Sequence, residues 1–306
     1  SKITAYEQTG PQRKLSPGVV DMVLRTRSGY KITFDTSDDF SSSSETIDVL
    51  NLRSVRAAEY VPAPNPEHRP DKPIIVPPEA FNFIQMIYPE CYNTLEKIPN
   101  KLITDKTINA SSMFNGCNSL LEIPEMNTRN MTAMNTMFFD CYNISTVPMM
   151  ETYKVTTMNG IFGNCYKLET IPSLDTRNVR SFSRAFLNCS TLISLPELDM
   201  SSAVYTDDMF KGCNALEQVS FKKNTLRVDM DFSDCNLSTA CVLEIIKNLG
   251  KPLGSKARTI VFDHVCPDQI DNIDNFKYIF SIEAYNKYIQ PALEAGWIFI
   301  GIKWEE

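Results

Sequence analysis

The feature that most constrains the fold is a ladder of cysteines along the middle of the chain. Seven of the nine cysteines are separated by 26, 24, 24, 24, 24 and 22 residues, and an aromatic residue stands three positions before each. A repeat of this length with its own hydrophobic signature is typical of a solenoid, in which each repeat forms one coil. The pairs are Tyr88 and Cys91, Phe114 and Cys117, Phe138 and Cys141, Phe162 and Cys165, Phe186 and Cys189, Phe210 and Cys213, and Phe232 and Cys235.

A second pattern follows the cysteines. In the middle copies, a leucine or isoleucine comes three residues after the cysteine, and an aliphatic residue and a proline come further on. We expect each coil to consist of two short strands joined by turns, with a tight turn after the phenylalanine. One coil alone cannot bury these side chains, so neighbouring coils must stack. The first copy has an extra residue before Leu95 and the last has Ser220 in place of the proline, as expected for end copies.

This repeated pattern resembles the BspA-like leucine-rich repeats, in particular a variant in which Met-Phe-x-x-Cys precedes Leu-x-x-Ile-Pro. Met113-Phe114-Asn-Gly-Cys117 and the run from Leu168 to Val179 carry it almost letter for letter. The resemblance covers about half of the chain. It implies a curved repeat scaffold found in bacterial surface proteins, phage proteins and some parasites, generally linked to adhesion, and it implies no catalytic residues.

The cysteines are expected to be buried free thiols that act as small hydrophobic side chains. They occupy one position in successive repeats, and a chain of this size does not need disulfides for stability. Zinc binding would need closely spaced ligands, whereas the chain has no Cys-x-x-Cys and only two histidines, His68 and His264. The sequence therefore predicts no metal and no cofactor.

The fold class expected from these patterns is mainly β with some α, in four parts. Residues 1–60 are expected to form a small β-rich module with a hairpin around Ser28-Gly29. Residues 61–78 contain seven prolines and favour a linker, the alternative being a proline-rich ligand for a partner's aromatic groove. Residues 79–237 are expected to form the leucine-rich-repeat solenoid of about six coils, and residues 238–306 an α/β cap on its open end. In this cap, Ser281 to Ala295 are expected to form a helix interrupted by Pro291, and Gly296 to Trp304 a final strand.

Charge and hydropathy argue against two functions. A formal net charge of −7 argues against nucleic-acid binding, which needs a basic face. No run of 18 apolar residues is present, so we expect no membrane insertion. The first residues lack the apolar core of a signal peptide. We therefore expect either that the chain is not exported by that route or that its sequence has been trimmed.

Catalytic patterns are not evident in the sequence. It contains no Gly-x-Ser-x-Gly, no phosphate-binding glycine loop and no His-Glu-x-x-His. Carboxylates near the end of the repeats could serve a glycosidase or bind calcium, but they lack the regular spacing of a calcium loop. We therefore expect a solvated acidic surface, formed by Asp207, Asp208, Asp229, Asp231 and Asp234.

The candidate binding surface is a corner that recurs in the repeats. Thr128-Arg129-Asn130 and Thr176-Arg177-Asn178 occupy the same position in two coils, with Tyr153-Lys154 between them. Stacking should place these residues on one edge, and arginine and tyrosine are favoured in binding hot spots. The alternative, which we favour, is that threonine and asparagine satisfy the turn's backbone while the arginines stay free to bind. The predicted binding residues are Arg129, Tyr153, Lys154 and Arg177.

These observations favour a non-enzymatic structural or interaction protein. Because no signal peptide, anchor or membrane span is evident, we expect a phage virion component, such as a tail, fibre or baseplate-associated protein that presents the solenoid for protein or glycan binding. Its partners would be other virion proteins in a larger assembly. The alternatives are a bacterial cell-surface or secreted adhesin that binds host protein or glycan and, third, a carbohydrate-active enzyme.

Overall fold

The computed structural model describes residues 73–264 and 276–305, together with the backbone of four strands near the N-terminus. The rest of the expected 1–60 module and residues 61–72 of the expected linker lie outside the described residues, as do His68 and Cys266. The four strands are β1 (Lys2–Ile3), β2 (Gly18–Thr26), β3 (Gly29–Asp35) and β4 (Thr46–Asp48).

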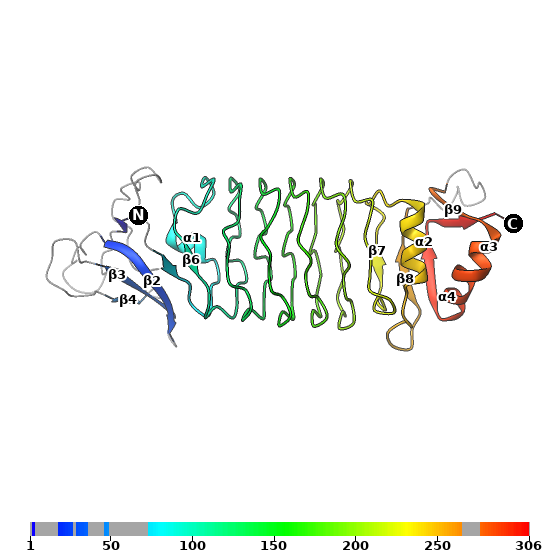
Figure 1. The fold of residues 1–306 in the computed structure, drawn as a ribbon, viewed down its shortest axis with the longest axis horizontal. Coiled ribbons are helices and arrows are strands. Elements are labelled where there is room, and N and C mark those ends of the chain that lie inside the picture. Colours follow the sequence, from blue (N-terminus) through cyan, green and yellow to red (C-terminus); the bar gives the residue numbers. More distant parts are fainter. Residues whose placement is uncertain are drawn as a thin grey trace.

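The middle of the chain is a stack of similar coils that forms most of the length of the molecule (Figure 1). Backbone groups of each coil bond the next: the Phe138 N–H donates to the Ile161 carbonyl and the Phe162 N–H to the Ala185 carbonyl, both at 2.9 Å. Because buried backbone groups need such partners, each coil depends on its neighbours. Single-residue parallel bridges also join the coils in one column, which we call the bridge column: Glu79, Asn109, Ala133, Thr157, Ser181 and Tyr205.

The coils contain turns where the sequence predicted two short strands. Between β6 (Leu102–Ile103) and β7 (Met230–Asp231), a segment described throughout, the chain forms isolated bridges and no strand. Two residues in each middle coil, four positions apart, have a left-handed backbone; Thr136 (φ 51°) and Asp140 (φ 61°) are one such pair. These turns change the chain direction before consecutive residues can pair, so the prediction of strands is wrong.

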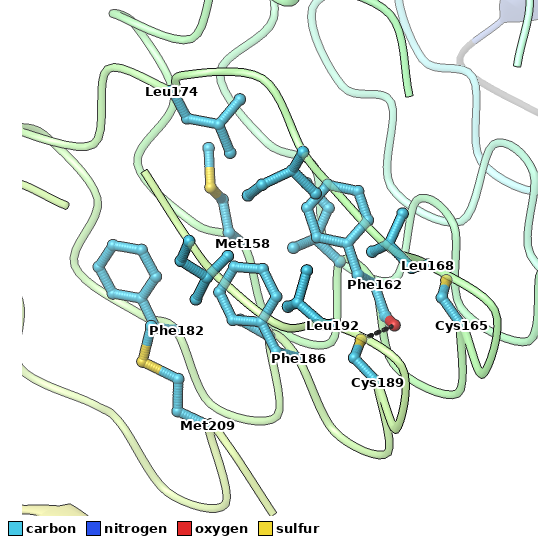
Figure 2. Close-up of a cluster of buried hydrophobic side chains, with 14 of the residues drawn as sticks. Met158, Phe162, Cys165, Leu168, Leu174, Phe182, Phe186, Cys189, Leu192 and Met209 are labelled. Atoms are coloured by element: carbon cyan, nitrogen blue, oxygen red, sulfur yellow. Dashed lines mark hydrogen bonds between the residues drawn. The ribbon is translucent and has the colours of Figure 1, made fainter. Parts of the chain in front are cut away.

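Columns of equivalent side chains fill the centre of the stack (Figure 2). From Phe114 to Phe210, the phenylalanine rings of successive coils stack with their centroids 5.5 to 5.7 Å apart. The thiols of the middle cysteines donate to the phenylalanine carbonyl of the preceding coil, as Cys189 does to Phe162 at 3.2 Å. The cysteine is therefore a small core residue that also satisfies a backbone carbonyl.

Phe139 departs from this repetition, because its ring lies over the backbone of the next coil. A Cβ atom at Gly163 would lie 2.4 Å from Phe139 Cε2, and one at Gly160 would lie 3.2 Å from Phe139 Cδ2. The two glycines thus leave the space that the ring occupies.

A mixed sheet begins the stack. Its strand order is β4-β3-β2-β5-β6, where β5 is Ile74–Ile75. β2 and β3 pair antiparallel, as expected of the hairpin, whereas β2 with β5 and β5 with β6 pair in parallel. Ile74 and Val76, at the end of the proline-rich segment, are buried in the core. A short helix, α1 (Phe83–Ile87), lies in the first coil.

A helix and a parallel sheet close the other end of the stack. The side chain of Ser238 accepts a hydrogen bond from the Cys241 N–H at the start of α2 (Thr239–Lys247). In the sheet, β7 pairs with β8 and β8 with β10, while β9 pairs with β11 beside a helical segment (Figure 1). The bounds are β8 (Arg258–Val261), β9 (Tyr278–Phe280), α3 (Ile282–Ala284), the π-helix η5 (Tyr285–Ile289), α4 (Gln290–Glu294), β10 (Trp297–Ile300) and β11 (Ile302–Trp304).

This end differs in two details from the sequence-based prediction. The helix expected from Ser281 to Ala295 is not interrupted at Pro291, because α3, the π-helix η5 and α4 follow one another without a gap, with the π-helical turn directly before the proline. The expected final strand is divided at Gly301 (φ 87°) into β10 and β11, which pair with different strands. No helix among the described residues is long and apolar enough to cross a membrane.

Candidate binding edge

The threonines of the recurring corner hold successive coils together. Thr128, Thr152 and Thr176 are buried, and each donates its hydroxyl to a carbonyl of the next coil at 3.0 to 3.1 Å. The Thr128 and Thr176 hydroxyls also accept from backbone N–H groups, of Glu151 at 2.7 Å and of Asp199 at 2.8 Å. A buried hydroxyl with both kinds of partner is fully satisfied, so the threonines have a structural role.

The asparagines of the corner bond the preceding coil. Asn130 Nδ2 donates to the Asp105 carbonyl at 2.9 Å, and Asn178 Nδ2 donates to the Tyr153 carbonyl at 2.7 Å. Threonine and asparagine therefore satisfy the backbone of this corner, as the favoured interpretation of the sequence had it.

The four predicted binding residues lie on one edge of the stack, which we call the binding edge. Arg129, Tyr153, Lys154 and Arg177 come from three consecutive coils, and all four side chains are exposed. Lys154 Nζ donates to Asn130 Oδ1 at 2.9 Å and lies 5.6 Å from the centroid of the Tyr153 ring. The edge thus combines cations with an exposed aromatic ring.

The arginines of the edge have ion-pair partners, whereas the sequence led us to expect that they stay free. Arg177 binds Asp175 through two contacts of 2.8 Å, from Nε to Oδ1 and from Nη2 to Oδ2. Arg129 Nε lies 3.8 Å from Glu151 Oε2. Both arginine side chains remain at least 60% exposed, and ion pairs so exposed contribute only about 0–1 kcal/mol. A ligand can therefore compete for either arginine.

Three exposed residues beside the binding edge were missed from the sequence: Arg180, Val204 and Tyr205. The Arg180 carbonyl accepts from the Val204 N–H at 2.9 Å and from the Tyr205 N–H at 3.1 Å, so the three residues adjoin. The sequence could have indicated these residues, because the repeat changes at their positions. One coil earlier, Thr156 stands at the position of Arg180 and Ser181 at that of Tyr205.

The acidic residues near the end of the stack have separate partners. Asp208 Oδ2 lies 3.5 Å from Arg184 Nε, and Asp229 Oδ2 lies 2.8 Å from Arg258 Nη1. Asp234 accepts from the Gly212 N–H at 2.8 Å. Within residues 73–264 and 276–305, no group of three or more His, Cys, Asp or Glu side chains is placed to hold a metal ion. These carboxylates therefore stabilise local turns and ion pairs.

Burial makes the thiols of the stack poor nucleophiles. It raises the pKa of Cys117 and of Cys213 to about 12, and it holds the pKa of Cys165 well above the ordinary thiol value. All eight described cysteines are free thiols, of which Cys91 is partly exposed and the others are buried. Because the thiolate is the reactive form, the buried ladder is expected to be inert in the folded protein.

Comparison with known proteins supports the resemblance at a coarse level. Residues 108–224 match the model of a family described as "Mycoplasma protein of unknown function, DUF285", which is related to the BspA-like leucine-rich repeats. The match spans less than half of the chain and contains the cysteines from Cys117 to Cys213. No curated protein and no solved structure matches the chain.

Proposed function

We propose that the chain is a non-enzymatic interaction protein. In this proposal the stack is a BspA-like leucine-rich-repeat solenoid of the Met-Phe-x-x-Cys variant, and the binding edge contacts another protein. The observation that carries the proposal is the gathering of Arg129, Tyr153, Lys154 and Arg177 from three consecutive coils.

Two properties of the binding edge support this role. The backbone beneath it is held by the hydrogen bonds of Thr128, Thr152 and Thr176, so little backbone freedom is lost when a partner binds. Its exposed side chains include arginine and tyrosine, which contribute more than other residues to the energy of protein interfaces.

Site-specific crosslinking tests the proposal. A photoreactive amino acid at Tyr153 should crosslink one discrete partner in extracts that contain the protein, and Arg129→Glu combined with Arg177→Glu should abolish that product. The control carries the same amino acid at Thr170, which is exposed and lies outside the binding edge. Equal products from both positions, or a product that survives the double substitution, would show that the edge is not the interface.

The location of the protein is part of the proposal. We propose the phage virion or, alternatively, the bacterial cell surface. The description of the matched family names a mycoplasma protein, and this specific observation supports the bacterial alternative. Mass spectrometry of purified virions and of surface-labelled cells distinguishes the two, because the chain should be enriched in only one preparation.

The third alternative, a carbohydrate-active enzyme, makes a separate prediction. Incubation of the protein with a panel of glycans should release no reducing ends above the level of a heat-denatured sample. Repeated turnover of any glycan would overturn the non-enzymatic proposal.

A further inference from the structure

A row of small side chains adjoins the binding edge. Along the bridge column, Ala133, Thr157 and Ser181 occupy equivalent positions in three coils. Tyr205 takes this position in the next coil, and its side chain is 56% exposed. The large ring therefore ends this floor of small residues.

Two asparagines next to this floor are oriented by their neighbours. Asn135 Oδ1 accepts from Thr157 Oγ1 at 2.6 Å and from the Asn159 N–H at 3.0 Å, and Asn159 Oδ1 accepts from Ser181 Oγ. Their oxygens are thus occupied, while neither Nδ2 group has a hydrogen-bond partner among the residues that the structure describes. Because each asparagine amide has two donors and one acceptor oxygen, this orientation leaves donors available to a ligand.

Arg180 adds a positive charge beside these donors. It is exposed, and within the described part of the chain its guanidinium has neither an ion pair nor a side-chain hydrogen bond. Its N–H donates to the Thr156 carbonyl at 2.9 Å, which places Lys154 of the binding edge nearby in the preceding coil. Lys154 itself bonds the neutral amide of Asn130. Neither cation therefore has a bound carboxylate within residues 73–264 and 276–305, although the chain as a whole carries a net charge of −7.

Two carboxylates next to this surface have partners of different kinds, a hydroxyl for Asp207 and cations for Asp208. Asp207, two residues after Tyr205, accepts from Ser183 Oγ at 3.3 Å. Asp208 is paired with Arg184 and also lies 3.8 Å from Lys211. An acidic ligand over Arg180 and Asn159 would therefore meet donors, while the aspartates limit its extent toward the end of the stack.

We propose that Asn135, Asn159, Arg180 and Tyr205, here called the donor face, bind an acidic, extended segment of a protein partner together with Lys154. The inference rests on the proposed function and names the chemistry of its partner. Carboxylates of the segment would accept from Arg180, Lys154 and the asparagine amides, in charge-assisted hydrogen bonds. Its apolar side chains would contact Tyr205 and Val204. These apolar contacts favour a peptide over an anionic polysaccharide.

Fluorescence anisotropy with a labelled peptide of alternating Glu and Val tests this inference. The protein should bind this peptide and not a matched peptide of alternating Lys and Val, and high salt should weaken the binding. Arg180→Glu should weaken it about tenfold or more, and Arg180→Gln less. Both variants should fold, because in the described residues only the backbone of Arg180 bonds the rest of the chain.

Lys167→Glu is the matched control. The substitution changes the charge by the same amount as Arg180→Glu. Because Lys167 is exposed and lies outside both the donor face and the binding edge, the affinity for the Glu–Val peptide should stay within about twofold of the wild type. Three results would overturn the inference: binding of the Lys–Val peptide as tightly, an effect of Lys167→Glu as large as that of Arg180→Glu, or tighter binding of a heparin fragment than of the Glu–Val peptide. If crosslinking from Tyr153 still succeeds in that case, the proposed function stands without this inference.

Discussion

The interior and the surface of the stack follow the 24-residue repeat differently. Inside, the stacked rings and the thiol–carbonyl hydrogen bonds recur with nearly constant geometry from coil to coil. Outside, one equivalent position holds Thr132 and Thr156, whose hydroxyls bond the preceding coil, and then changes to the exposed side chains of Arg180 and Val204. The repeated residues therefore specify how the coils join, and exposed positions that depart from the repeat mark further places where a partner can bind.

Truncation of an interior ring should give the largest effect and tests this comparison directly. Phe162→Ala removes a ring that is stacked on both sides, and it should lower the free energy of unfolding by about 3–5 kcal/mol. Tyr153→Ala, on the binding edge, should change it by no more than about 0.5 kcal/mol. Urea denaturation followed by circular dichroism measures both, and similar losses for the two variants would refute the division between interior and surface.

Addition of one methyl group at Gly163 should have the next largest effect. The new Cβ would overlap the Phe139 ring, and the clash should cost about 1–3 kcal/mol of stability. In a Phe139→Ala background the ring is absent, so Gly163→Ala should then cost much less. The four-way comparison in urea isolates this contact, and an equal cost in both backgrounds would place the strain elsewhere.

The third effect, which should be small for any single thiol near pH 9, is a pH dependence that the buried thiols cause. Burial raises the pKa of Cys165 in the folded protein, whereas the unfolded thiol ionises near its ordinary value of 9.0. The stabilisation is therefore complete below about pH 9 and is lost as the pH rises toward the folded pKa, by about 1.4 kcal/mol per pH unit for each thiol.

The variant Cys165→Ala isolates one thiol of the ladder. Its stability should fall less steeply than that of the wild type above pH 9, by the contribution of one thiol. Urea denaturation of both proteins at several alkaline pH values gives the difference in their free energies of unfolding. The ionisation of tyrosines affects both proteins equally and cancels in this difference. Parallel curves for the two proteins would mean that Cys165 ionises as easily in the folded chain as in the unfolded one.

The sequence predicted the interior better than the path of the chain. The spacing of Phe162 and Cys165 identified side chains that stack, because buried positions are constrained to recur. The turns were not predictable, because left-handed positions accept different residues: Thr136 and Arg184 adopt the conformation that Gly160 adopts between them. Because the positions of the left-handed residues were not known from the sequence, the segments between the buried residues were interpreted as strands.

The candidate site was predictable only in part. The 24-residue register of the repeats placed Arg129 and Arg177 on one edge. The short spacing from Asp175 to Arg177 could have indicated the ion pair between these two residues. Arg180 and Tyr205 were missed because the search followed residues that recur, and these two do not. The orientation of the Asn159 amide depends on a hydroxyl in the next coil, and sequence separation alone does not show that contact.

The hydrogen bond from each middle cysteine to the phenylalanine carbonyl of the preceding coil also makes the middle coils interchangeable. Every middle coil offers a thiol to one neighbour and a carbonyl to the other, as Cys165 and Phe162 do. Gain or loss of one complete 24-residue unit would leave both junctions intact, with the β5–β6 and β7–β8–β10 sheets still at the two ends. Such a chain can lengthen its lateral surface by duplication while its interior stays the same.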